Sequence, residues 1–549
     1  MPNPNLSISQ HYHQQTKYSP ETIKQQAGPL DWDNQPVPFK DYKIGLEYAL
    51  KPYLEEDKES GSGSIHDLDA KIQQQRKRLS RLLLCSYGLT VKIITQTGDT
   101  VFFRSAPSAG ALYPAEVYLV SRGTDVLAPG LYYYQPKGHR LIQFWDSNVW
   151  QSLQEACFWH PSLDHTQFAL VTTAVYGRSV WRYRARAYRR ILLDTGHLLG
   201  NIELACAINQ YRPHLIGGFA DEALNQMLYL DPDQEGGLAV MALADLLEVQ
   251  QNLPLYPTAL GSAVHPADEA IAPHQLLPNL HEASSISPTQ NVNWKTIKIS
   301  NPLAQDGPSQ KEAERPSSSL PENEASSSAK TSDGKSLDKY NFPFCLKVET
   351  AIEPAIDWDV ELLGLEATIL KRRSTRSYSG SNLSLEDVKR LLDFTYQPHH
   401  YPPQGLDRSP DYFDLSLIET FIVVSGVDDL DEGCYYYAPH AQELRQIRFR
   451  NFRRDLHFLC LKQDLGRDAA VVVFHTADLK KAIHRYGDRA YRYLHMDAGH
   501  LGQRMNLAAI RLGLGVSGIA GFFDDSVNEV LGIPSDEAVL YITTLGQPA

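Results

Sequence analysis

Arginine and serine side chains gather in one short segment in the second half of the chain, Lys371-Arg-Arg-Ser-Thr-Arg376. Guanidinium groups form paired, charge-assisted hydrogen bonds with phosphate oxygens, and the Ser374 hydroxyl adds a donor. A helix is predicted shortly afterwards at residues 385–394, with Ser384 as its N-cap. The segment suits a terminal phosphate, although from these residues alone a solvated basic turn is the commoner structure.

A second segment, Pro107-Ser-Ala-Gly-Ala-Leu-Tyr-Pro114, is suited to a flat ring. Its small residues let the backbone approach a ligand closely, so that N–H and C=O groups can contact the ring edges. Taken singly, an ordinary loop before a strand is the simpler interpretation. A site that uses both segments would need both halves of the chain.

A third pattern occurs twice, as Asp194-x-Gly-His197 and as Asp497-x-Gly-His500. It could hold a metal ion or form an Asp–His dyad. Both copies, however, lie in long and mostly apolar helices predicted at residues 188–208 and 491–512, which are expected to be buried between domains. Buried, hydrogen-bonded histidines at that interface are the better interpretation, and we predict no metal site.

These patterns belong to an internal repeat with an offset of 303 residues. Arg186-Ala-Tyr-Arg matches Arg489-Ala-Tyr-Arg, and 16 of the 45 positions in 186–230 and 489–533 are identical. The chain is therefore a tandem of one domain type. Buried strands are predicted at matching places in both halves, at residues 117–120, 169–174, 421–424 and 469–474.

The composition places a linker between the two copies. Ser, Pro, Glu, Lys and Asn dominate residues 281–340, which cannot bury enough apolar surface to offset the entropy of ordering. We expect a disordered linker that spans about 40 Å on average. The predicted domains are residues 1–280, with an N-terminal arm that wraps the first domain, and residues 341–549.

The bulk properties exclude several classes of partner. A net charge of −13 and a pI near 5.8 argue against nucleic acid. The six cysteines have no metal-like spacing and indicate buried thiols of a reducing compartment. No apolar run reaches 18 residues and no signal-like segment opens the chain, so we expect a cytoplasmic protein without a membrane partner.

In order and spacing, these motifs resemble the FMN-dependent nitroreductase superfamily, and specifically its SagB-type branch of azoline dehydrogenases. The resemblance covers nearly everything except the linker and includes Gly518-Ile-Ala-Gly-Phe-Phe-Asp-Asp525 near the C-terminus. It implies an α+β fold with two fused nitroreductase-type domains that form an intramolecular pseudo-dimer. It also implies FMN at the interface, bound by the residues Arg372, Arg373, Ser374, Arg376, Gly518, Ile519, Ala520 and Gly521 of the second domain and Pro107, Ser108, Ala109, Gly110 and Leu112 of the first.

Each half has lost a different part of this site. Residues 61–75, where the first domain should carry the arginine-rich segment, contain no arginine. Residues 410–417 replace the small-residue loop in the second domain and are bulky and acidic, a poor environment for a flavin that becomes anionic on reduction. One possible interface site keeps both parts and the other keeps neither, so we predict one FMN per chain in a composite site.

The resemblance also implies a Lys-Tyr pair as the catalytic base, but the matching residues here are Arg182-Tyr183 and Arg485-Tyr486. Arginine stays protonated and cannot serve as that base, although Tyr183 could still act. Arg182 is equally well explained as a salt-bridging helix residue.

The predicted function is hydride transfer between flavin and a small-molecule or peptide substrate such as an azoline. Two alternatives stay open: an NAD(P)H-dependent nitro or quinone reductase, and a flavin-binding pathway partner without turnover.

Overall fold

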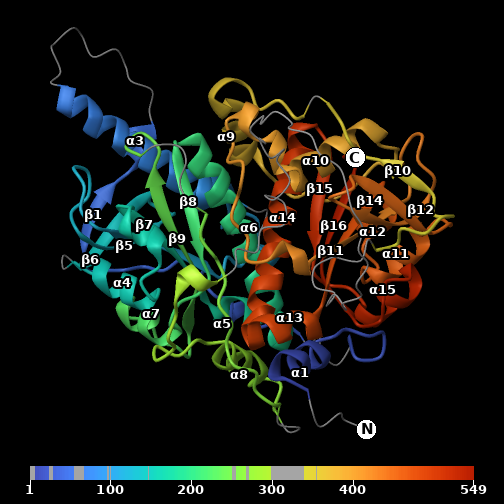
Figure 1. Cartoon of the computed structure of the whole chain (residues 1–549), viewed down its shortest axis with the longest axis horizontal. Helices are drawn as coiled ribbons and strands as arrows, with labels where there is room; N and C mark the ends of the chain where they lie inside the picture. The colour runs from blue at the N-terminus through green and yellow to red at the C-terminus, as the bar shows by residue number, and fades with distance from the viewer. Residues whose placement is uncertain are drawn as a thin grey trace, which may run out of the picture.

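The protein is described here from a computed structural model that covers residues 6–23, 29–54, 67–94, 98, 100–145, 148–249, 255–267, 271–297, 339–353 and 355–549. Figure 1 shows two α+β halves side by side, the first coloured blue to green and the second orange to red. Residues 55–64, a short charged and Gly/Ser-rich insertion whose composition predicts mobility, lie outside the described residues, as does most of the predicted linker.

Each half contains a seven-stranded antiparallel sheet, and the strand order is the same in both. This identity of order confirms the predicted tandem α+β fold. The first sheet runs β1 (Leu46–Ala49), β6 (Arg140–Trp145), β5 (Gly130–Gln135), β4 (Ala115–Ser121), β7 (Phe168–Val175), β9 (Glu235–Asp245) and β8 (Tyr211–Ile216). The second runs β10 (Lys347–Glu349), β13 (Glu443–Arg448), β12 (Gly433–Ala438), β11 (Glu419–Val424), β14 (Val471–Asp478), β16 (Glu537–Gly546) and β15 (Gly515–Ile519).

Helices cover these sheets and fill the space between them. Ser384 caps α10 (Leu385–Tyr396) as predicted, since its side chain accepts a hydrogen bond from the backbone N–H of Asp387. A hairpin without a counterpart among the described residues of the second half, β2 (Leu89–Ile94) and β3 (Thr100–Arg104), leads into the small-residue loop. The helices are α1 (Ile8–Gln15), α3 (Asp67–Tyr87), α4 (Trp150–Ala156), α5 (Tyr176–Tyr183), α6 (Ala187–Ile208), α7 (Asp221–Met227), α8 (Leu276–Ala283), α9 (Leu363–Lys371), α10 (Leu385–Tyr396), α11 (Arg453–Leu459), α12 (Asp464–Asp468), α13 (Leu479–Tyr486), α14 (Ala490–Arg511) and α15 (Asp524–Leu531).

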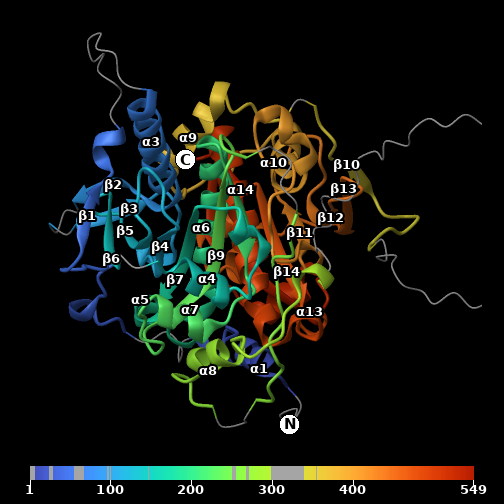
Figure 2. The same cartoon turned by 60° about the vertical axis from the view of Figure 1, so that its left-hand side comes forward.

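The long helices α6 and α14 cross at the centre of the molecule and join the two halves (Figure 2). They approach most closely at Gly196 and Gly499, where a side chain on either residue would overlap a backbone carbonyl oxygen of the other helix. The stretch Tyr176–Ile208 is long and apolar enough to cross a membrane, but 94% of its most apolar part is buried inside the protein. The apolar character of α6 is therefore explained by this interface.

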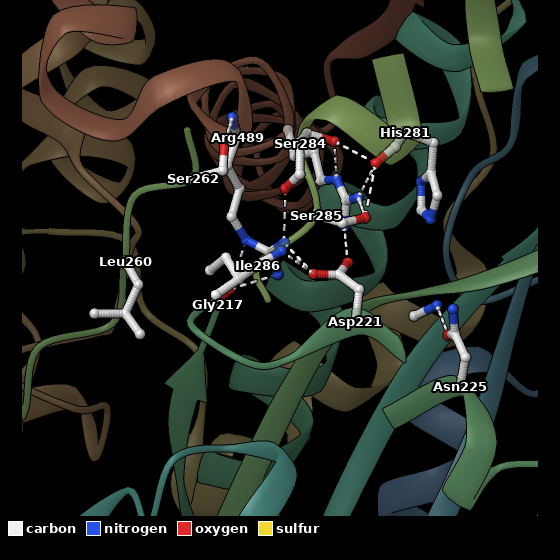
Figure 3. Close-up of polar contacts among 12 residues, drawn as sticks. Gly217, Asp221, Asn225, Leu260, Ser262, His281, Ser284, Ser285, Ile286 and Arg489 are labelled. Atoms are coloured by element: carbon white, nitrogen blue, oxygen red, sulfur yellow. Dashed lines mark hydrogen bonds and ion pairs between the residues drawn. The ribbon is translucent and has the colours of Figure 1, made fainter. Parts of the chain in front are cut away.

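Two matching clusters of buried ion pairs fix the crossing. Arg489 and Arg492, at the start of α14, bind the Asp221 carboxylate of the other half at 2.6 Å each, and the backbone N–H of Ile286 donates to it at 2.9 Å. Figure 3 shows Arg489 reaching across to Asp221. Burial alone would raise the pKa of Asp221, but the two arginines outweigh it and lower that pKa. The matching residues, 303 positions away, are Arg186, Arg189 and Asp524.

One predicted boundary is wrong, and the predicted role of the N-terminal arm is incomplete. The predicted linker starts at residue 281, but residues 281–297 are folded: the His281 carbonyl accepts from Arg492 at 2.7 Å, and Trp294 is buried. The arm also does more than wrap the first domain. Ser9, on α1, donates to Asp488 of the second half at 2.7 Å, and Figures 1 and 2 both place α1 and α8 beneath the two halves. The amino-acid composition of a segment indicates the entropy cost of ordering it. Composition does not indicate the contacts with the rest of the chain that offset this cost.

Candidate functional site

The two motifs predicted to share a ligand meet at one cavity between the halves. The cavity has a volume of about 550 Å³, within the range typical of small-molecule and cofactor sites. A larger groove of about 1460 Å³ between α3 and residues 357–363 contains none of the predicted site residues. The predicted residues that line the 550 Å³ cavity are Pro107, Ser108, Ala109, Gly110, Arg182, Arg372, Arg373, Ser374, Arg376, Gly518 and Ala520.

Four predicted residues do not line the cavity. Leu112 and Ile519 are buried in the core, at 2% and 3% exposure. Gly521 lies near Leu461 and Arg190, outside the cavity wall. Tyr183 is close to it, because its hydroxyl would touch a side chain placed on Gly110. The structure therefore brings most of the predicted set together and places these four beside or behind the wall.

Arg372 supplies a buried positive charge with an unused donor. Its Nε donates to the Ser105 carbonyl of the first half at 2.7 Å, whereas its Nη1 is buried without a hydrogen-bond partner. Burial lowers the pKa of Arg372 to about 10, so the group remains cationic at neutral pH. A buried cation with an unsatisfied N–H is costly unless an anion is bound, which suits the predicted phosphate or another acceptor.

Asp194 holds the small-residue loop in place. The carboxylate accepts from the Ser108 hydroxyl at 2.5 Å and from the backbone N–H of Ala109 at 3.1 Å. Burial raises the pKa of Asp194 to about 7. Asp497 does the same in the other half, accepting from the N–H groups of residues 413 and 414 at 3.0 and 2.8 Å. Both aspartates of the repeated pattern therefore position loops.

A chain of hydrogen bonds fixes the orientation of Tyr541 in the cavity wall. Asn201 donates to the Cys85 carbonyl, and Gln503 Nε2 donates to Asn201, so Gln503 Oε1 must accept from His197 Nδ1 at 3.0 Å. Burial lowers the pKa of His197 to about 3, so the ring is neutral and its Nε2 accepts from the Tyr541 hydroxyl at 2.9 Å. The Tyr541 oxygen is thus left as an acceptor. These contacts confirm the prediction of a buried, hydrogen-bonded histidine for His197. His500 is also buried, but its Nε2 has no hydrogen-bond partner within the described ranges and lies 3.7 Å from a Glu203 carboxylate oxygen.

The matching place in the second half is filled by the chain itself. Phe413 stacks on Tyr493 with ring centroids 4.6 Å apart, and Tyr412 packs on His500 at 4.3 Å. The backbone N–H of Leu215, which corresponds to Gly518, donates to the Asp411 carboxylate at 3.0 Å. Residues 411–413 therefore fill the space that is a cavity in the first site. Asp411 also accepts from the backbone N–H whose counterpart in the first site is left open.

Sequence reasoning missed several residues of the cavity wall. Arg190 and Tyr541 have different residue types, Tyr493 and Ala239, at the matching positions of the other half, so the repeat gives no signal for them. Val101 and Phe103 come from the β2–β3 hairpin, which has no counterpart in the part of the second half that the structure describes. The repeated Asp-x-Gly-His pattern did single out Asp194 and His197. It indicated a place at the domain interface, however, and not in the cavity wall.

Comparisons with known proteins agree with this architecture. A sequence profile of the nitroreductase family matches residues 75–244 and 369–547, once in each half. A crystal structure from Anabaena variabilis ATCC 29413, provisionally named a nitroreductase, is 58% identical, covers 99% of this chain and 100% of its own, and has a TM-score of 0.86. The provisionally named nitroreductase MJ1384 of Methanocaldococcus jannaschii is 31% identical over 32% of this chain and 87% of its own length.

Two further relatives are named as processing proteins. The microcin B17-processing protein McbC of Escherichia coli is 30% identical over 26% of this chain and 54% of its own length. The trifolitoxin-processing protein TfxF of Rhizobium leguminosarum bv. trifolii is 30% identical over 24% of this chain and 42% of its own length. This chain therefore matches only about half of either protein.

Proposed function

The chain belongs to the nitroreductase family of oxidoreductases, and on that premise we propose that it binds one FMN in the cavity between its two halves. The observation that carries this proposal is the meeting of the arginine-rich segment of one half with the small-residue loop of the other at a single cavity. Neither half supplies both parts, so the binding site requires the whole chain.

The residues present fit a flavin nucleotide. Arg372 offers an unused buried N–H, and Arg373, Ser374 and Arg376 line the same side of the cavity, so this group would hold the phosphate. The loop clamped by Asp194 would lie against the ring. When bound, the flavin would supply two-electron redox chemistry that no amino-acid side chain provides.

The protein's own part in the chemistry would be placement and charge. Arginines in the cavity favour negative charge on a bound ring, and the fixed Tyr541 oxygen can accept a hydrogen bond from a ligand N–H or O–H. For Tyr183, burial raises the pKa and the nearby arginines Arg190 and Arg182 partly offset that rise. Tyr183 is therefore the residue that we propose for proton transfer where Arg182 cannot act.

Two substrate classes are consistent with such a site. Similarity to McbC and TfxF favours oxidation of a ring in a peptide, such as an azoline. Arginine at position 182 removes the lysine base expected for that reaction, which favours the second candidate, an NAD(P)H-dependent reductase of nitroaromatics or quinones. Steady-state reduction of a quinone by NADPH would support the reductase, and its absence in flavin-loaded protein would favour the peptide substrate.

The FMN assignment is tested with two neighbouring variants. Arg376 lines the cavity and is exposed, so Arg376→Ala should weaken FMN binding by about 10- to 100-fold without disturbing the fold. Lys371→Ala, five residues earlier and outside the cavity, is the matched control and should bind FMN as the wild type does. Equal flavin retention by both variants, measured from the absorbance of the purified protein, would contradict the assignment.

A further inference from the structure

The second half of the chain contains a copy of the Arg182–Tyr183 pair together with its bound partner. Arg485 Nη1 lies 2.7 Å from Asp414 Oδ2, and the Tyr486 hydroxyl donates to the same oxygen at 3.0 Å. The Asp414 side chain is 1% exposed. At this place in the fold, an arginine followed by a tyrosine therefore holds a carboxylate that is shielded from water.

The first half has the same pair without that carboxylate. The residue that corresponds to Asp414 is Ala111, which lines the cavity, as Arg182 does. Among the residues that the structure describes, no carboxylate oxygen lies within 4 Å of the Arg182 guanidinium. Arg182 and the Tyr183 hydroxyl instead lie against Gly110 and take the space that a side chain on that residue would need. Arg182 therefore lines the cavity and Tyr183 lies beside it, whereas the equivalent place in the second half is filled by that half's own loop.

The charge of the cavity also favours an anionic ligand beyond the flavin phosphate. Five arginines line the cavity, and Asp194 is the sole carboxylate among the described residues of its wall. Arg190, 5% exposed, stacks on the Tyr183 ring at 4.2 Å and donates to the Ala520 carbonyl at 2.8 Å. The phosphate site at residues 372–376 belongs to the second half, whereas Arg182 and Arg190 belong to the first. The positive charges of Arg182 and Arg190 are therefore left to bind a second anion besides the flavin phosphate.

We propose that Arg182 and Tyr183 bind a carboxylate group of the substrate and hold it in the cavity as Arg485 and Tyr486 hold Asp414. The substrate class is then a carboxylic acid, either a small molecule or a peptide with an acidic group near the reacting atoms. This inference rests on the proposed function, because it names the substrate of the proposed flavin site.

The test uses full-length, FMN-loaded protein and two isosteric probes, benzoate and benzamide. Each is titrated against the visible absorbance of the bound flavin, which reports binding beside the ring without turnover. Benzoate should bind at least about tenfold more tightly than benzamide, since only benzoate can pair with a guanidinium group. Arg182→Gln should weaken benzoate by about 10- to 100-fold and leave benzamide unchanged, and Tyr183→Phe should weaken benzoate by about 2- to 10-fold.

The matched control is Arg485→Gln, the equivalent substitution in the other half, which should leave the benzoate affinity unchanged. Equal affinities for the two probes, no spectral change with benzoate, or an Arg182→Gln variant that binds benzoate normally would each overturn the inference. Loss of flavin in Arg182→Gln alone would also overturn it, because Arg182 would then hold the cofactor. Wild-type protein that takes up no FMN would instead overturn the proposed function.

Discussion

At the scale of single residues, matching positions in the repeat keep one structural task while their surroundings diverge. Asp194 and Asp497 each clamp a loop through backbone N–H groups, although one loop lines the cavity and the other fills the second site. Burial raises the pKa of each carboxyl to about 7. A residue that is conserved within the chain for such a task carries no information about which site is functional.

These two carboxyl groups make stability depend on pH in a direction that can be worked out. A raised folded-state pKa means that the folded protein holds these protons between the unfolded value, about 4, and about 7. Stability should therefore fall as the pH rises from about 4 to about 7. Asp497→Asn, outside the cavity, should reduce the slope of the unfolding free energy against pH by about one proton. An unchanged slope in urea unfolding would show that Asp497 is ionised throughout this range.

At the scale of helices and strands, periodicity predicted much of the fold. The strands at 117–120, 169–174, 421–424 and 469–474 and both long helices are present, since burial on one or both faces leaves a clear apolar pattern. Periodicity could not predict the glycine contact between α6 and α14. The sequence shows that Gly196 is repeated as Gly499. It does not show that glycine is required there because the backbone of a helix about 300 residues away lies against it.

Gly196→Ala should separate the two long helices. Its methyl group would overlap the Met496 carbonyl oxygen, so the helices would have to move apart and lose packing contacts. We expect a loss of about 1–3 kcal/mol in unfolding free energy. Gly177→Ala, in the exposed part of α5, meets no atom within 4 Å and should be neutral or slightly stabilising. Thermal unfolding of both variants measures the difference, and equal midpoints would contradict the close crossing.

At the scale of the whole molecule, the chain combines what a homodimer would divide between two identical subunits. The arginine-rich segment and the small-residue loop could be predicted as partners because each half had lost one of them. The parts of the site that could not be predicted, Arg190 and Tyr541, depend on contacts across the interface, to the Ala520 carbonyl and to His197. Once two copies are fused, each position can change independently, and the repeat no longer identifies such residues.

Fusion also lets one of two equivalent sites close. Tyr412 and Phe413 fill the second site with stacked rings, and Asp411 accepts from the backbone N–H that the first site leaves available near Gly518. To bind a flavin there, the chain would have to expose both rings and leave a buried carboxylate without its donors, which costs several kcal/mol. Titration of the purified apoprotein with FMN should therefore saturate at about one equivalent per chain. Saturation at two equivalents would contradict the composite site, since the second flavin would have to displace this loop.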